Sequence, residues 1–225
     1  MEIRRQYSIV RHDRALTGSI PSSDNMLRLV IETSGADCSI ALIENGKIVA
    51  ERHERVGRGH AERLMPWIAG LPEGGRAEEI IVGCGPGSFT GVRIAIAAAR
   101  GLGLGWNIPV RGVSSLALVA AAHAKGEMTV AVEGGHGEIF VQDFSGAPFA
   151  EVGHFRSLTP EAAAIATTNR LVIGSGAARL VNARGTGEAA DGEARAANAR
   201  LLPETAMMGP PRPVYGRDAD ARPIA

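Results

Sequence analysis

The sequence has little cysteine and no long uninterrupted apolar run. Its 225 residues include only two cysteines, Cys38 and Cys84, which form no C-x-x-C pair. This argues against a disulfide scaffold or a zinc site, and predicts two buried structural thiols in a reducing, cytoplasmic compartment. The longest apolar stretch, which follows Gly91, is interrupted by Arg93 and Arg100. It is too short for the roughly 20 residues that a bilayer requires, so no membrane association is expected.

Net charge and closely spaced histidines are absent as well. The 24 basic and 24 acidic residues cancel, and the balance predicts no concentrated basic surface of the kind that direct nucleic-acid binding requires. Six histidines occur without an H-E-x-x-H or H-x-x-x-H pair, so their spacing predicts no metal site. His60, at the beginning of an expected helix, is interpreted as a capping or interface residue.

The chain divides into an N-terminal segment and two lobes. Residues 1–26 carry scattered charges and no signal-peptide core, which indicates a disordered extension or a mis-called start. From Leu27 the order strand, hairpin, helix, strand, helix occurs twice. It predicts a first α/β lobe at 27–125 and a shorter one at 126–225, each with a mixed sheet and flanking helices. Asn45-Gly46 predicts a tight hairpin turn, whereas 182–200 is expected to be a loose loop or a marginal helix.

The motif "GPGSFTG" at 85–91 raises the question of a phosphate loop. The third glycine of a dinucleotide fingerprint is replaced by Thr90, and Val92 follows Gly91 where a P-loop has lysine. Pro86 occupies the position where a nucleophile elbow has glycine. The motif therefore predicts a tight strand-to-helix turn in which Ser88 or Thr90 caps the helix.

The helix expected at 91–106 is apolar on more than one face, and one of these faces carries mainly small side chains, alanine and glycine. One face can pack on its own sheet, and the second predicts a contact with another chain, with complete burial inside its own fold as the alternative. Trp67 of the preceding helix, at 60–69, is expected to lie off that helix's core stripe and to join the contact. The predicted contact residues are His60, Leu64, Trp67, Ile68, Arg93, Ile94, Ala97, Ala98 and Gly101.

A weaker set of residues is compatible with an ATP site. Two strands end in a glutamate, and glycine-rich turns follow in the first and second lobes, which gives carboxylates for a metal ion or water and amides for phosphates. The hairpin turns carry no basic residue that would contact phosphate. The alternative function is therefore a stand-alone ATPase or kinase that uses Glu32, Ser34, Glu133, Gly134, Gly174 and Gly176.

Several segments together resemble the TsaB (YeaZ) family. They are "LVIETSGADCSIALIENGKIVAE", "GHAERLMPWI", "GPGSFTGVRI" with the helix after it, and the terminal "PVYGRDADARP". The resemblance is strong from Leu27 to about residue 124, where "GPGSFTGVRI" is highly specific. Beyond Gly126 it is carried by the order of elements.

The resemblance implies a two-lobed actin/hexokinase-like (ASKHA) fold and a subunit that is not catalytic alone. Such a subunit pairs with TsaD, which carries the ATP site and the metal ion, to make threonylcarbamoyl-adenosine beside the tRNA anticodon. The resemblance places the pairing surface on the helices at 60–69 and 91–106. It also implies TsaE and TsaC as functional partners, tRNA contact through the complex, no cofactor of the chain's own, and a homodimer as another use of the same helices.

Two positions depart from the family pattern. Glu32 stands where the family usually has aspartate, and Glu133-Gly134-Gly135 replaces a usual Asp-Ala-Arg. Both departures fall on the expected cleft rather than on the expected pairing helices.

Overall fold

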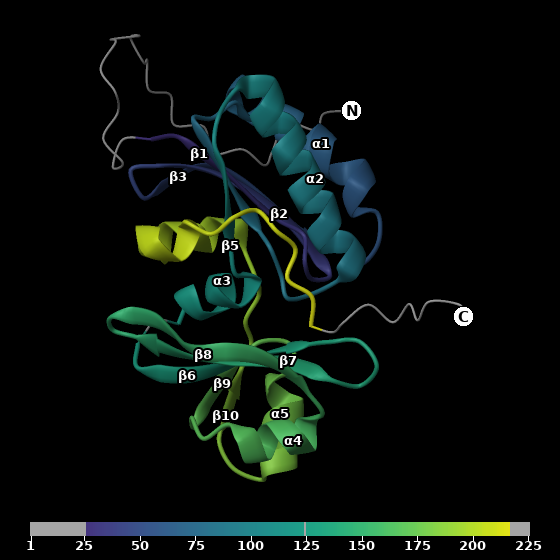
Figure 1. Ribbon diagram of the computed structural model, residues 1–225, viewed down its shortest axis with the longest axis vertical. Helices are drawn as coiled ribbons and strands as arrows, with labels where there is room; N and C mark the ends of the chain where they lie inside the picture. The colour runs from purple at the N-terminus through teal and green to yellow at the C-terminus, as the bar shows by residue number, and fades with distance from the viewer. Residues whose placement is uncertain (1–25, 124, 217–225) are drawn as a thin grey trace, which may run out of the picture.

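Two five-stranded mixed sheets frame the protein in the computed structural model, which describes residues 26–123 and 125–216 (Figure 1). The prediction for 1–26 lies, apart from Met26, outside the described residues. The strand orders are β3-β2-β1-β4-β5 and β8-β7-β6-β9-β10. In each sheet the first three strands pair antiparallel, and the remaining strands pair in parallel with the first strand and with each other. The predicted repeat of element order is therefore confirmed as two sheets of equivalent topology.

The elements of the first lobe follow the expected order. Its elements are β1 Arg28–Glu32, β2 Asp37–Glu44, β3 Lys47–Arg55, α1 His60–Ala69, η2 Pro72–Gly75, β4 Glu79–Gly83, α2 Phe89–Trp106, β5 Val110–Val113 and α3 Ser115–Ala121.

The second lobe and the segment after it complete the chain. Their elements are β6 Glu127–Glu133, β7 Ile139–Gly146, β8 Phe149–Leu158, α4 Pro160–Ala166, β9 Leu171–Ile173, α5 Ala177–Arg184, β10 Glu188–Ala190, η3 Ala196–Leu201 and η4 Glu204–Met207.

Helices cover both outer faces of the pair of sheets and also fill the space between them. Figure 1 shows α1 and α2 against the first sheet, α4 and α5 against the second, and α3 with the C-terminal η3 between the two. Successive residues of β1 therefore belong to different cores. Leu29 and Ile31 of β1 belong to the core under α1 and α2, whereas Val30 belongs to the core between the sheets. Because neighbouring side chains on a strand point to opposite faces, each central strand is apolar on both.

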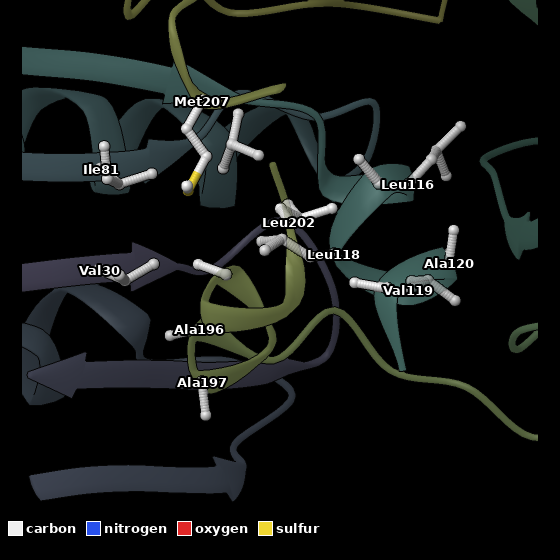
Figure 2. Packing of buried hydrophobic residues seen from close by; sticks show 14 of the residues in the cluster. Val30, Ile81, Leu116, Leu118, Val119, Ala120, Ala196, Ala197, Leu202 and Met207 are labelled. Atoms are coloured by element: carbon white, nitrogen blue, oxygen red, sulfur yellow. The ribbon is translucent and has the colours of Figure 1, made fainter. Parts of the chain in front are cut away.

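The core between the sheets joins the two lobes. Val30 and Ile81 of the first sheet share one cluster with Met128 and Val130 of the second. Figure 2 shows α3 and the C-terminal segment inserted there, with Leu116, Leu118, Ala196, Ala197 and Leu202 directed into it. The lobes therefore share a single apolar layer.

Of the loose loop or marginal helix expected at 182–200, the end of the segment forms the short 3-10 helix η3, whereas Glu188–Ala190 forms a strand and the burial of η3 was not expected. Ala196, Ala197 and Ala199 are buried in η3 against α3 and the first sheet. Alanine-rich sequence without a clear period gives no sign of burial, because the packing partners of these small side chains come from distant segments.

The predicted turn and helix caps are present. Asn45 and Gly46 both have positive φ, at 53° and 68°, as a type I′ hairpin turn requires. Of the two candidate caps for α2, Ser88 is the one used, and its Oγ accepts a hydrogen bond from the Gly91 amide at 3.2 Å. Thr159 caps α4 in the same way.

Both cysteines are free and buried, as expected of structural thiols. Burial raises the pKa of Cys38 to about 12 and that of Cys84 to about 11. The two thiols are therefore protonated at neutral pH, which disfavours nucleophilic or redox chemistry.

Gly91 allows α2 to lie directly against the end of β1. Its carbonyl accepts a 2.7 Å hydrogen bond from the Thr33 hydroxyl, and a Cβ at this position would overlap the Thr33 carbonyl oxygen. The glycine is needed because two backbones meet here.

We expect opposite effects from two glycine-to-alanine substitutions in α2. Gly91→Ala should lower the free energy of unfolding by about 2 kcal/mol or more, because the added methyl group meets backbone. Gly101→Ala should raise it by about 1 kcal/mol, since the site is open and alanine favours the helix. Urea unfolding of both variants checks this, and equal effects would contradict the close approach at Gly91.

Candidate functional site

Glu32 closes β1 and lies beneath the cleft rather than in it. Its side chain is 1% exposed, and its carboxylate accepts hydrogen bonds from the Ser115 hydroxyl at 2.6 Å and from the Ser34 amide. Burial raises the pKa of Glu32, and the serine hydrogen bonds offset part of that rise. A carboxyl group enclosed in this way does not reach a ligand in the cleft, so its predicted role toward a nucleotide does not fit its position.

Glu133 ends the matching strand β6 and is paired. Its Oε2 lies 2.6 Å from Nη1 of Arg179 on α5, and its amide donates to the Ser175 hydroxyl at 2.9 Å. The carboxylate is half-exposed. The ion pair neutralises the Glu133 carboxylate, which was predicted to bind the metal ion of a nucleotide.

The glycines of the predicted nucleotide site use their amides inside the fold. Gly134 donates to the Glu138 carbonyl at 2.9 Å, Gly174 to Ala190 at 3.0 Å and Gly176 to Ala131 at 2.9 Å. A Cβ at Gly174 would overlap the Ala131 carbonyl. These glycines therefore permit close packing of the turn after β9 on β6, and their amides are engaged by carbonyls.

The cleft between the lobes has a volume of about 600 Å³ and an acidic lining. Ser34, Gly35 and Ala36 of the β1–β2 turn meet Glu133 and Ser175 of the second lobe there. Its charged lining residues are one arginine and four acids, namely Arg55, Asp37, Glu133, Asp191 and Glu193. An excess of negative charge repels the phosphates of a nucleotide and attracts cations.

The outward face of α2 is a second candidate surface, on which exposed apolar side chains lie beside Arg93 and Arg100. Phe89 is 53% exposed and Leu104 is 86% exposed, and Ala97 and Gly101 lie exposed between them. At 100° per residue these side chains fall within one third of the helix circumference. The prediction of a second apolar face holds for Ala97 and Gly101, whereas Ile94 and Ala98 at its margin are half-buried against the first core.

The predicted contact residues of α1 lie mostly in the interior. His60, Leu64, Trp67 and Ile68 are all at most 7% exposed, and the last three pack in the core under α1 and α2. The expectation that Trp67 lies off the core stripe is wrong, since it is buried and Arg52 lies 4.2 Å from its ring. The exposed residues of α1 are Ala61, Glu62, Arg63, Met65, Pro66 and Ala69.

Arg93 and Arg100 hold the C-terminal segment against α2. The Arg93 guanidinium lies 3.4 Å from the centre of the Phe89 ring and its Nε donates to the Tyr215 hydroxyl at 2.7 Å. Arg100 Nη2 donates to the Pro211 carbonyl at 2.6 Å. Arg93, predicted as a partner contact, therefore has an intramolecular role. The sequence did not indicate this, because its partner is 122 residues away.

Comparisons with known proteins find related sequences. The TsaD family model, described as "tRNA N6-adenosine threonylcarbamoyltransferase", matches residues 47–147. The protein named "tRNA threonylcarbamoyladenosine biosynthesis protein TsaB" of Escherichia coli is 40% identical over 97 residues, which are 41% of this chain and 42% of that protein. The protein of the same name from Haemophilus influenzae is 30% identical over 151 residues, 61% and 63% of the two chains.

One solved structure extends the likeness over more of the fold. YeaZ from Pseudomonas aeruginosa superimposes with a TM-score of 0.71 at 28% identity, over 84% of this chain and 99% of its own. The chain spans about half the length of the curated relatives that it matches, between 42% and 63% for the two above.

Two sheets of equivalent topology around a central cleft, with flanking helices, define a two-lobed protein of the actin/hexokinase-like (ASKHA) fold. Within that class the chain is similar to proteins of the TsaB (YeaZ) family. Among the described residues, no helix combines the length and apolar character needed to cross a membrane.

We expect Glu32 to make stability depend on pH. Since its folded pKa is raised above the ordinary value of 4.5, the folded state binds the proton more tightly than the unfolded state does. Its contribution is therefore fully present below about pH 4.5 and is lost as pH rises through the folded pKa, with a slope of up to about 1.4 kcal/mol per pH unit.

Glu32→Gln removes this titration. The difference in unfolding free energy between wild type and variant, measured in urea from pH 4 to 8, should shift in favour of the variant as pH rises. Because other groups titrate in both proteins, they cancel in the difference. A difference independent of pH would contradict the enclosed position of the carboxyl group.

Proposed function

We propose that this chain is a non-catalytic subunit in the biosynthesis of threonylcarbamoyl-adenosine in tRNA, and that it pairs with TsaD. The names of its relatives support a role in threonylcarbamoyl-adenosine biosynthesis. The match to the TsaD family model over 47–147 supports a shared fold with the proposed partner. In this proposal TsaC supplies the activated threonylcarbamoyl group, TsaE joins the pair, and tRNA is contacted through the complex.

The observation that carries the proposal is the exposed apolar face of α2. Leu104 is 86% exposed and Phe89 53%, and the small residues Ala97 and Gly101 between them let another helix approach closely. Met65 of α1 is 45% exposed on the helix that packs beside α2. Exposed large apolar side chains grouped on one face are typical of a protein contact, and Arg93 and Arg100 lie on the same face.

The cleft supports a role without chemistry of its own. The Glu32 carboxyl is enclosed, Glu133 is paired with Arg179, and the amides of Gly134, Gly174 and Gly176 are engaged within the fold. We therefore place the ATP and the metal ion of the reaction on TsaD. A stand-alone ATPase or kinase is disfavoured by the acidic lining of the cleft.

Two equally exposed side chains provide a matched test of the pairing surface. Leu104 on α2 is 86% exposed and Ile165 on α4 is 87% exposed. Leu104→Glu should weaken binding to the cognate TsaD by about a hundredfold, because a charge would be buried in an apolar contact. Ile165→Glu should leave binding unchanged, as judged by calorimetry and by co-elution of the purified proteins.

Ala97→Glu extends the test to the centre of the face and should also prevent co-elution. Failure of the wild-type chain to bind TsaD would overturn the proposal, and equal binding by all three variants would move the contact away from α2. Sizing without TsaD shows whether the same face makes a homodimer. In that case Leu104→Glu should give monomers at concentrations where wild type is dimeric.

A further inference from the structure

Three side chains that can bind a metal ion meet at one edge of the cleft. Asp37 begins β2, His53 lies on β3, and Glu193 follows β10 in the segment that returns from the second lobe. Each places one ligand atom so that all three atoms lie within 4.8 Å of one another. The residues are 16 and 140 positions apart in the sequence, so a search for closely spaced histidines could not find them.

The fold fixes the backbone on both sides of this cluster. Ser39 pairs with His53 across the β2–β3 ladder, and Asp37 lies two residues before Ser39 on the same face. The Ser39 hydroxyl accepts a 2.9 Å hydrogen bond from the buried Ala196 amide. Gly192 is packed against Ile173, since a Cβ there would touch its side chain. The segment that carries Glu193 is therefore fixed on both sides, and it places Glu193 beside the β2–β3 hairpin.

The cluster contains polar atoms that lack partners. Oδ1 of Asp37 and Nδ1 of His53 are both buried without a hydrogen bond, and Nε2 of His53 lies 3.0 Å from Oε2 of Glu193. Within residues 26–123 and 125–216, no ion pair to Asp37 was found. Buried polar groups without partners are costly, and a bound cation would satisfy the carboxylate.

We propose that Asp37, His53 and Glu193 bind one divalent transition-metal ion, for which zinc is the best match. An imidazole with two carboxylates is a ligand set of zinc and similar metals, whereas magnesium and calcium prefer oxygen ligands alone. Tetrahedral zinc bonds of about 2.0–2.2 Å place neighbouring ligand atoms about 3.3–3.6 Å apart, so the His53–Glu193 separation of 3.0 Å has to widen by only a few tenths of an ångström.

The remaining adjustment is small and falls on the exposed residue. The Glu193 side chain is 49% exposed and free to rotate, while that of His53 is 14% exposed and fixed by the strand. Asp191, another carboxylate that lines the cleft, raises the local concentration of cations. Water completes the coordination from the open side of the cleft.

The bound ion would tie the two lobes together. Asp37 and His53 belong to the first sheet, and Glu193 belongs to the segment that leaves the second. An ion shared by them closes one side of the cleft, and ligand binding to the folded state alone raises the midpoint of thermal unfolding. This inference is independent of the proposed pairing with TsaD, which involves the opposite face of the first sheet.

The test is zinc binding by the chelator-treated full chain, measured by calorimetry and by thermal unfolding. We expect one ion per chain and a higher unfolding midpoint with zinc. His53→Gln and Glu193→Gln should each weaken binding by about tenfold or more, since each removes one ligand. The matched control is His154→Gln on exposed β8, which should bind as wild type does. Magnesium at the same concentration should not compete.

Absence of zinc binding by wild type would overturn the proposal. Unchanged zinc affinity in Glu193→Gln would also overturn it, because Glu193 lies in an exposed loop where the substitution leaves folding intact. Equal loss in the His154→Gln control would show adventitious binding and would also overturn it. Circular dichroism of the zinc-free variants separates a lost ligand from a lost fold. If His53→Gln does not fold, Glu193→Gln and Asp37→Asn decide the outcome.

Discussion

The apolar layer shared by the two sheets is the interaction on which the rest of the structure depends. Val30 and Ile81 from one sheet and Met128 and Val130 from the other enclose α3 and η3 in a single core. Hydrophobic stabilisation scales with the apolar area removed from water, so neither sheet could expose its inner face without losing much of it. The cleft consequently lies at the edge of a filled interior, and the outer face of α2 remains exposed for contact.

Much of the fold could be predicted because its determinants are local. Alternating and apolar strands, the Asn45-Gly46 turn and the serine and threonine caps each involve a few neighbouring residues, and they gave the order of elements and the mixed sheets. Burial of the alanines in η3 could not be predicted, since their partners come from α3 and β2. Trp67 is a different case, because it lies three residues after Leu64 and next to Ile68 on one helical face, so the spacing alone was sufficient to place it in the core.

The same distinction between local determinants and contacts of distant segments applies to the candidate sites. The apolar character of α2 follows from its composition, so an exposed face with Ala97 and Gly101 could be predicted. Which charges are enclosed, paired or clustered depends on contacts between distant segments. Ser115 with Glu32, Arg179 with Glu133, and Glu193 with His53 each join residues more than forty positions apart. Residue types alone suggested two carboxylates facing a nucleotide, and tertiary packing gives one enclosed acid and one ion pair.

The C-terminal segment also determines the electrostatic character of the α2 face. Arg93 and Arg100 point from the same side of the helix as Ala97 and Leu104, yet Tyr215 and the Pro211 carbonyl hold both guanidinium groups. While residues 211–215 stay in place, a partner meets a surface whose two cations already have hydrogen-bond acceptors. If the segment were displaced, the same helix would present two free cations and attract an acidic surface. The position of this short segment thus sets how many guanidinium hydrogen-bond donors the α2 face offers to a partner.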